Sequence, residues 1–167
     1  KAIVKPGIYS IDKDRLLHEN PVLVEDQHYF LFVHGTNSNT INAFLDPGQD
    51  VNKSETNGKF FSQIIQQYSD KIIALEHHTL TKTPLENVLD LVNGLPKKVD
   101  LTILSHSRGG LVTDALLLCV DAKKDNTRSA KVADFLKDEN RNLDLSVFSQ
   151  IMTALDQREI NIRQVIK

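Results

Sequence analysis

Short apolar segments alternate with segments of helical periodicity along most of the chain. Three segments are almost continuously apolar, as is typical of parallel strands that are covered on both faces. They are residues 29–34, 71–76 and 99–104. Weaker strand patterns lie at residues 7–12 and 22–24, and a last apolar segment, 160–166, opens a further strand. The pattern therefore predicts a sheet with three buried strands at its centre.

Helical periodicity lies between these strands. The clearest helix start is Thr83, followed by Pro84 and by Glu86, which form a capping box that satisfies otherwise unpaired N–H groups. Gly94 marks the end of that helix. Apolar spacing predicts the other helices within residues 61–68, 110–120, 132–136 and 144–157. Residues 36–58 are rich in Asn, Ser, Gly and Asp, which predicts a long loop.

The alternation of strands and helices predicts the α/β class, with a mostly parallel sheet flanked by helices. One domain over residues 1–167 is expected, because 40% hydrophobic and 25% charged residues are typical of a globular core. A helical insertion or lid is predicted at about 122–158. The last strand stops at Lys167, so the sheet is expected to be incomplete at its C-terminal end. The first residue, Lys1, likewise suggests a processed or partial chain.

The composition excludes several classes of protein. A formal net charge of −2 gives no attraction to phosphate backbones, so no nucleic-acid partner is expected. The longest apolar run, residues 115–120, is far shorter than the roughly 20 residues that span a bilayer, so no transmembrane segment is expected. Cys119, the only cysteine, fits as a small buried hydrophobe in a reducing compartment, and a cytoplasmic location is expected.

Ser107 is the strongest candidate for chemistry. It stands in Ser105-His106-Ser107-Arg108-Gly109, directly after a predicted strand and before a predicted helix. A strand, a sharp turn and a helix around a serine form a nucleophile elbow. The turn lifts the hydroxyl above the sheet and aims the next backbone N–H at a developing oxyanion. The plainer interpretation is that Ser107 only caps the helix.

A second loop offers the complementary group. His34, Gly35 and Thr36 follow the strand at 29–34, so the backbone N–H of Thr36 is a candidate oxyanion donor beside that of Arg108. The side chain of Arg108 would bind a substrate carboxylate or form surface ion pairs. Four residues are expected to support this geometry, namely His34, Gly35, His106 and Gly109.

The base that would activate Ser107 is not evident. The chain has six histidines, and none follows Ser107, whereas this type of elbow orders its triad as serine, acid and then histidine. His77 and His78 follow a predicted strand and would reach the same rim of the sheet, as substrate contacts or as a substitute base. Asp121 and Asp125 lie beyond a helix of about 12 residues, roughly 18 Å away.

Metal and cofactor chemistry is not expected. Adjacent histidines such as His77 and His78 point to opposite sides of a strand, and no Cys or Glu spacing completes a metal site around them. The sequence analysis therefore assigns no metal and no cofactor.

Three motifs give the chain a resemblance to the α/β-hydrolase superfamily, in its lipase-like and esterase-like branch. They are Leu-Phe-Val-His-Gly-Thr at 31–36, the segment 76–87, and Ser-His-Ser-Arg-Gly-Gly-Leu-Val at 105–112. More narrowly, the chain is similar to a bacterial group of predicted hydrolases, some of which are fused to caspase-like peptidase domains. The resemblance covers about residues 7–120 and implies an α/β-hydrolase fold.

The resemblance implies a serine hydrolase, esterase-like or lipase-like, that forms an acyl-enzyme on Ser107 with a small-molecule or lipid ester. Family members carry the acid and the histidine of the triad beyond a strand like residues 160–166. The chain alone is therefore expected to be inactive and to be linked to further sequence. The alternative is a catalytically inactive interaction or regulatory module of a larger protein. An acyltransferase or thioesterase would share the acyl-enzyme step.

Overall fold

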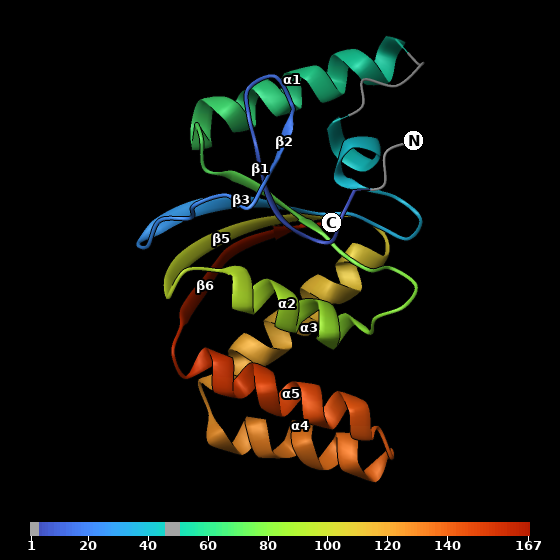
Figure 1. Cartoon of the computed structure of the whole chain (residues 1–167), viewed down its shortest axis with the longest axis vertical. Coiled ribbons are helices and arrows are strands. Elements are labelled where there is room, and N and C mark those ends of the chain that lie inside the picture. The colour runs from blue at the N-terminus through green and yellow to red at the C-terminus, as the bar shows by residue number, and fades with distance from the viewer. Residues whose placement is uncertain (1–3, 46–50) are drawn as a thin grey trace.

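The computed structural model describes residues 4–45 and 51–167 (Figure 1). Its middle layer is a six-stranded sheet with the strand order β2-β1-β4-β3-β5-β6. The strands are β1 (Gly7–Ile11), β2 (Leu17–Glu19), β3 (Gln27–Val33), β4 (Ile72–Glu76), β5 (Lys98–Ser105) and β6 (Glu159–Ile166). Strands β4, β3, β5 and β6 are parallel to one another, whereas β1 is antiparallel to both β2 and β4. The chain is thus an α/β protein with a mostly parallel sheet.

Helices cover both faces of this sheet (Figure 1). On one face lie α1 (Val51–Tyr68) and a short π-helix, η1 (Ile41–Leu45). On the other lie α2 (Pro84–Gly94) and α3 (Arg108–Lys123). Two further helices, α4 (Asn126–Asp138) and α5 (Asn142–Leu155), pack against α2 and α3 as an outer layer.

Strand β3 shows why the sheet needs cover on both faces. Every residue from Tyr29 to Val33 is buried, because successive side chains point to opposite faces and each face meets helices. Phe30 and Phe32 belong to the apolar cluster beneath α1, while Leu31 and Val33 belong to the cluster beneath α2 and α3. The continuous apolar run in the sequence is therefore the mark of a central strand.

The strand order brings the two candidate loops together. Strand β3 lies between β4 and β5 in the sheet. The chain that leaves β3 leads to β4 on one side, and the chain that leaves β5 leads to β6 on the other. A crevice forms at the carboxyl ends of strands where connections diverge in this way, and ligands of open α/β sheets bind there. The loops after β3 and β5 carry His34 to Thr36 and His106 to Arg108.

Three predicted elements differ from the structure. Residues 22–24 form no strand. The short edge strand is instead β2, which follows a turn after β1 and pairs with it. The predicted loop 36–58 is wrong in part, because η1 and the start of α1 fall inside it, while residues 46–50 lie outside the described residues. Helix α1 begins several turns before its apolar stripe at Phe61, so periodicity alone could not detect its start.

The predicted insertion at 122–158 consists of α4 and α5. These helices rest on α2 and α3 and do not lie directly over the sheet. Phe148 and Ile151 of α5 are buried in the same apolar cluster as Leu91 of α2. The helical pair therefore extends the core on this face by one layer.

Candidate active site

Ser107 occupies a sharp turn between β5 and α3. Its backbone angles are φ 54° and ψ −123°, and its exposed side chain makes no capping hydrogen bond to α3. A positive φ is sterically unfavourable for a residue with a Cβ, costing about 1–3 kcal/mol unless the surroundings impose it. The structure therefore places Ser107 at the N-cap position of α3 in a strained turn, where its hydroxyl makes no capping hydrogen bond.

Two glycines allow the backbone to approach this turn. A Cβ on Gly109 would lie 2.2 Å from the carbonyl oxygen of Val33 and 2.6 Å from that of His34. A Cβ on Gly35 would lie 2.8 Å from the Cβ of Ser107. Real Cβ atoms do not come so close to other atoms, so both positions require glycine for close approach. The loop after β3 is thus packed directly against the turn that carries Ser107.

Hydrogen bonds fix the two loops to each other. The backbone N–H of His106 donates to the carbonyl oxygen of Val33 at 3.1 Å. The N–H of Gly109 donates to the carbonyl oxygen of His106 at 3.0 Å, and that of Gly110 to Ser107 at 2.9 Å. These bonds close the turn and tie it to the end of β3. The conformation of Ser107 is therefore held by the backbone around it.

His34 is buried and orders the loop that contains Gly35. Its Nδ1 lies 2.9 Å from the carbonyl oxygen of Gly35, which can only accept a hydrogen bond, so Nδ1 carries a proton. Its Nε2 lies 3.2 Å from Oε2 of Glu76 and 3.3 Å from the backbone N–H of His77. The ring of His34 therefore contacts backbone groups at the ends of both β3 and β4.

Glu76 anchors the same cluster from β4. Its Oε1 accepts a hydrogen bond of 2.8 Å from the backbone N–H of Thr40. Burial raises the pKa of this carboxyl, but hydrogen bonds from His34 and Thr40 outweigh burial, so the pKa lies below its ordinary value. An ionised carboxylate buried in this way joins β3, β4 and the segment before η1.

His77 and His78 separate at the end of β4. The buried ring of His77 stacks on that of His34, with 4.3 Å between ring centroids, whereas His78 is exposed. Burial, followed by the neighbouring charge of His34, lowers the pKa of His77 to about 4. His77 is therefore neutral at physiological pH. Its Nε2 has no hydrogen-bond partner among the described residues.

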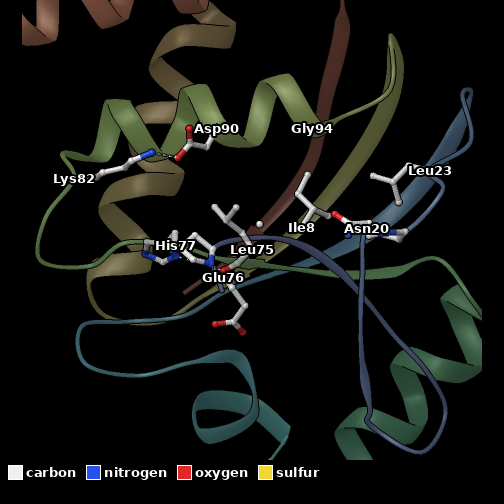
Figure 2. Close-up of a pocket in the computed structure, with 12 residues that line it drawn as sticks. Ile8, Asn20, Leu23, Leu75, Glu76, His77, Lys82, Asp90 and Gly94 are labelled. Atoms are coloured by element: carbon white, nitrogen blue, oxygen red, sulfur yellow. Dashed lines mark hydrogen bonds and ion pairs between the residues drawn. The ribbon is translucent and has the colours of Figure 1, made fainter. Parts of the chain in front are cut away.

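A cavity of about 530 Å³ lies beside His77, between α2 and strands β1 and β4 (Figure 2). Leu75 and Glu76 point to opposite sides of β4. On the α2 side of the cavity, Lys82 and Asp90 form an ion pair of 2.5 Å. Ser107 is not among the residues that line this cavity. Of the two histidines proposed as substrate contacts, His77 lines this cavity and His78 does not.

Thr36 and Arg108 follow the carboxyl ends of β3 and β5. Thr36 is exposed in the loop after Gly35, and Arg108 is the first residue of α3. The side chain of Arg108 donates from Nη2 to the carbonyl oxygen of Lys82 at 3.3 Å. It forms no ion pair with the residues that the structure describes, so the surface ion-pair role expected for it is not observed.

A family model matches residues 9–137, from β1 to the end of α4. The matched model is described as a domain of unknown function, DUF7379. The chain belongs to the DUF7379 family. The matched segment contains Ser107, the loop after β3 and the cluster of His34, Glu76 and His77. Comparison with curated proteins and with solved structures gave no match.

Two buried polar residues of this DUF7379 chain lie at the site but were not predicted from the sequence. Glu76 ends an otherwise apolar strand, and a carboxylate within such a run was the available signal. Asn87 is fully buried on α2 and donates from Nδ2 to the carbonyl oxygen of His78 at 2.9 Å. Its position on the same helix face as Leu91 was the corresponding signal. Both residues hold the ends of loops at the site.

The remaining candidates lie away from Ser107. Asp121 pairs with Arg128, and Asp125 caps α4 by accepting a hydrogen bond of 2.8 Å from the backbone N–H of Thr127. Cys119 is fully buried, and burial raises the pKa of its thiol to about 12. Within residues 4–45 and 51–167, no group of three His, Cys, Asp or Glu side chains is placed to hold a metal.

None of the helices in the described part of the chain combines the length and the apolar character of a membrane-spanning segment.

Proposed function

We propose that this DUF7379 chain carries the nucleophile of a serine hydrolase built on the α/β-hydrolase fold. One observation carries the proposal: an exposed serine in a strained strand-turn-helix junction, at φ 54° and ψ −123°, against which a glycine loop is packed. A serine that only capped α3 would not need such backbone angles. Strain of this kind is concentrated at functional sites because the surroundings must impose it.

The backbone around Ser107 supplies the electrostatics that acyl transfer requires. Ser107 immediately precedes α3, whose first N–H groups and dipole favour negative charge at that end. In the proposal, the N–H groups of Arg108 and Thr36 donate to the oxyanion of the tetrahedral intermediate. Each such donor contributes about 3–4 kcal/mol to stabilisation of the transition state.

The proposed reaction has two steps. The Oγ of Ser107 forms a bond to the ester carbonyl carbon, and its proton passes through a base to the departing alkoxide, which leaves as the alcohol. Water then attacks the acyl-enzyme, and the carboxylic acid leaves as Ser107 regains its proton. No hydrogen bond joins the Ser107 hydroxyl to a histidine within the described ranges. The proposal therefore assigns the base and its acid partner to sequence outside this chain.

The test is covalent labelling of the full-length protein by a fluorophosphonate, followed by mapping of the modified peptide. Modification is expected at Ser107, because the probe requires a serine with an activated hydroxyl. Ser107→Ala should abolish labelling and lower the hydrolysis of p-nitrophenyl esters by about a thousandfold or more. Ser149→Ala, which changes an exposed serine on α5, is the matched control and should label normally.

Folding must be checked beside labelling, by comparing the melting temperatures of the three proteins. If the full-length wild type is folded but Ser107 stays unmodified and no ester is hydrolysed, the proposed hydrolase is wrong. That result would favour a non-catalytic interaction module.

A further inference from the structure

An apolar groove of about 470 Å³ runs along α3 beneath the α4–α5 pair, and we name it the α3 groove. Its walls come mainly from side chains of α3, α4 and α5. They include Leu111, Ala115, Leu118, Val132, Phe135 and Phe148. Leu111, Leu118 and Phe135 are 54%, 48% and 57% exposed. Three large exposed apolar side chains in one groove form a patch of the kind that marks a binding site. The groove is thus shaped and lined to take an apolar molecule.

One end of the α3 groove is formed by Leu111, in the first turn of the helix that Ser107 precedes. Leu111 lies four residues after Ser107, about 6 Å along the helix axis, and Leu118 lies roughly 16 Å along it. Pro84 and Leu85, at the start of α2, form the same end of the groove. The side chain of Arg108 is tied to that segment through the carbonyl oxygen of Lys82. The groove therefore leads from the rim of the sheet along the helix that Ser107 precedes.

The groove also offers one unsatisfied polar atom. Asp144 lines it and is only 6% exposed. Its Oδ2 pairs with Nη2 of Arg141 at 2.5 Å, but its Oδ1 has no hydrogen-bond partner among the described residues. A hydrocarbon chain has no hydrogen-bond donor, so this oxygen would be satisfied by water and not by an apolar occupant of the groove.

We propose that the α3 groove binds the hydrocarbon chain of the acyl group that is transferred to Ser107. This inference rests on the proposed function and adds its substrate class, namely esters of medium-chain or longer fatty acids. The ester carbonyl lies at the turn, and the chain extends along α3 past Leu111 and Ala115 toward Leu118. Each buried methylene contributes about fourfold to binding, so the groove selects for chain length.

The first experiment compares kcat/KM for p-nitrophenyl butanoate and palmitate with the full-length protein, because a palmitoyl chain is long enough to reach Leu118. The palmitate should be preferred by about tenfold or more, because part of its added chain is buried in the groove. Leu118→Glu places a carboxylate in the groove at an exposed position and should reduce that preference about tenfold. Leu143→Glu is the matched control: Leu143 is 58% exposed on α5 but does not line the groove, and its variant should keep the preference.

The second experiment measures binding without turnover. Fluorescence of dansylundecanoic acid is titrated with the full-length Ser107→Ala protein, with and without Leu118→Glu. Binding should survive Ser107→Ala and weaken about tenfold with Leu118→Glu. This readout distinguishes the two proposals: if Ser107 is never labelled yet the dye binds in a Leu118-dependent way, the hydrolase is wrong and the groove remains a site for fatty chains.

Other outcomes overturn the groove alone. If Ser107 is labelled but chain length and Leu118→Glu have no effect on kcat/KM or on dye binding, the acyl chain lies elsewhere. If Leu118→Glu instead changes the oligomeric state measured by light scattering, while chain preference and dye binding are unchanged, the groove is covered by protein and the proposal is wrong.

Discussion

Gly109 is the residue on which the geometry of the turn most depends. The atoms that a side chain there would meet are backbone carbonyl oxygens of β3 and the loop after it, which cannot rotate away. Gly110, its neighbour on α3, differs sharply: a Cβ there would meet only Oγ of Ser105, at 4.0 Å. The same chemical change at two adjacent helical positions should therefore have opposite effects.

We predict that Gly109→Ala destabilises the protein by about 2 kcal/mol or more, because overpacking displaces α3 from β3. Gly110→Ala should be neutral or stabilising by up to about 1 kcal/mol, since alanine is the better helix former and has room. Urea unfolding of both variants measures the difference. Equal free energies of unfolding would show that β3 and α3 are not in the close contact described.

At the scale of single elements, α2 is the helix whose start is best defined. The hydroxyl of Thr83 accepts a hydrogen bond of 3.2 Å from the backbone N–H of Glu86, and the Glu86 carboxylate accepts one of 2.7 Å from the backbone N–H of Thr83. This reciprocal pair also fixes the Lys82 carbonyl that receives Arg108. The cap thus supports both the helix and the loop beside the turn.

Thr83→Ala should lower the free energy of unfolding by about 1 kcal/mol through loss of the cap. Thr81→Ala changes an exposed threonine in the same loop and should leave it unchanged. Chemical denaturation curves of the two variants give the comparison. A loss of similar size in both would mean that the loop, and not the cap, determines the effect.

Elements with a local cause could be predicted from the sequence. The capping box at Thr83, the apolar runs that became β3, β4 and β5, and the turn at Ser107 all arise from neighbouring residues. The first turns of α1 and the edge strand β2 could not, because their sequences are mostly polar and show no apolar periodicity. Sequence periodicity therefore detects buried faces and misses exposed ends.

The site divides in the same way. Ser107 and Gly109 could be placed because the elbow is one continuous segment. The contact between His34 and Glu76 could not, since it joins residues far apart in sequence and depends on the pairing of β3 with β4. The sequence alone did not indicate that the ring of His34 would contact Glu76.

At the scale of the whole molecule, burial of His77 links stability to pH. Its pKa is about 4 in the folded protein and 6.5 in the unfolded chain, so between these values only the unfolded chain binds the proton. Stability from this group is therefore complete above about pH 6.5 and falls as the pH drops toward about 4. The lowered pKa of Glu76 acts in the same direction as acid is added.

We predict that wild-type protein loses about 2 kcal/mol of stability between about pH 7 and pH 5 through His77. His77→Gln should remove most of that slope, because glutamine does not titrate, whatever its effect on absolute stability. His78→Gln changes the exposed neighbour and should keep the wild-type slope. Urea midpoints at the two pH values test this, and an unchanged slope in His77→Gln would contradict it.

The two apolar clusters lie on opposite faces of one sheet and share its central strand. Phe30 and Phe32 of β3 belong to the cluster with α1, and Leu31 and Val33 to the cluster with α2 and α3. The sheet is thus a partition within the molecule. Substitutions beneath α1 reach Ser107 by displacing β3 or β5, since Leu104 also packs against that cluster, whereas those beneath α3 act on the helix that begins there. Stability can therefore be altered from the α1 side with less effect on the Ser107 turn than from the α3 side.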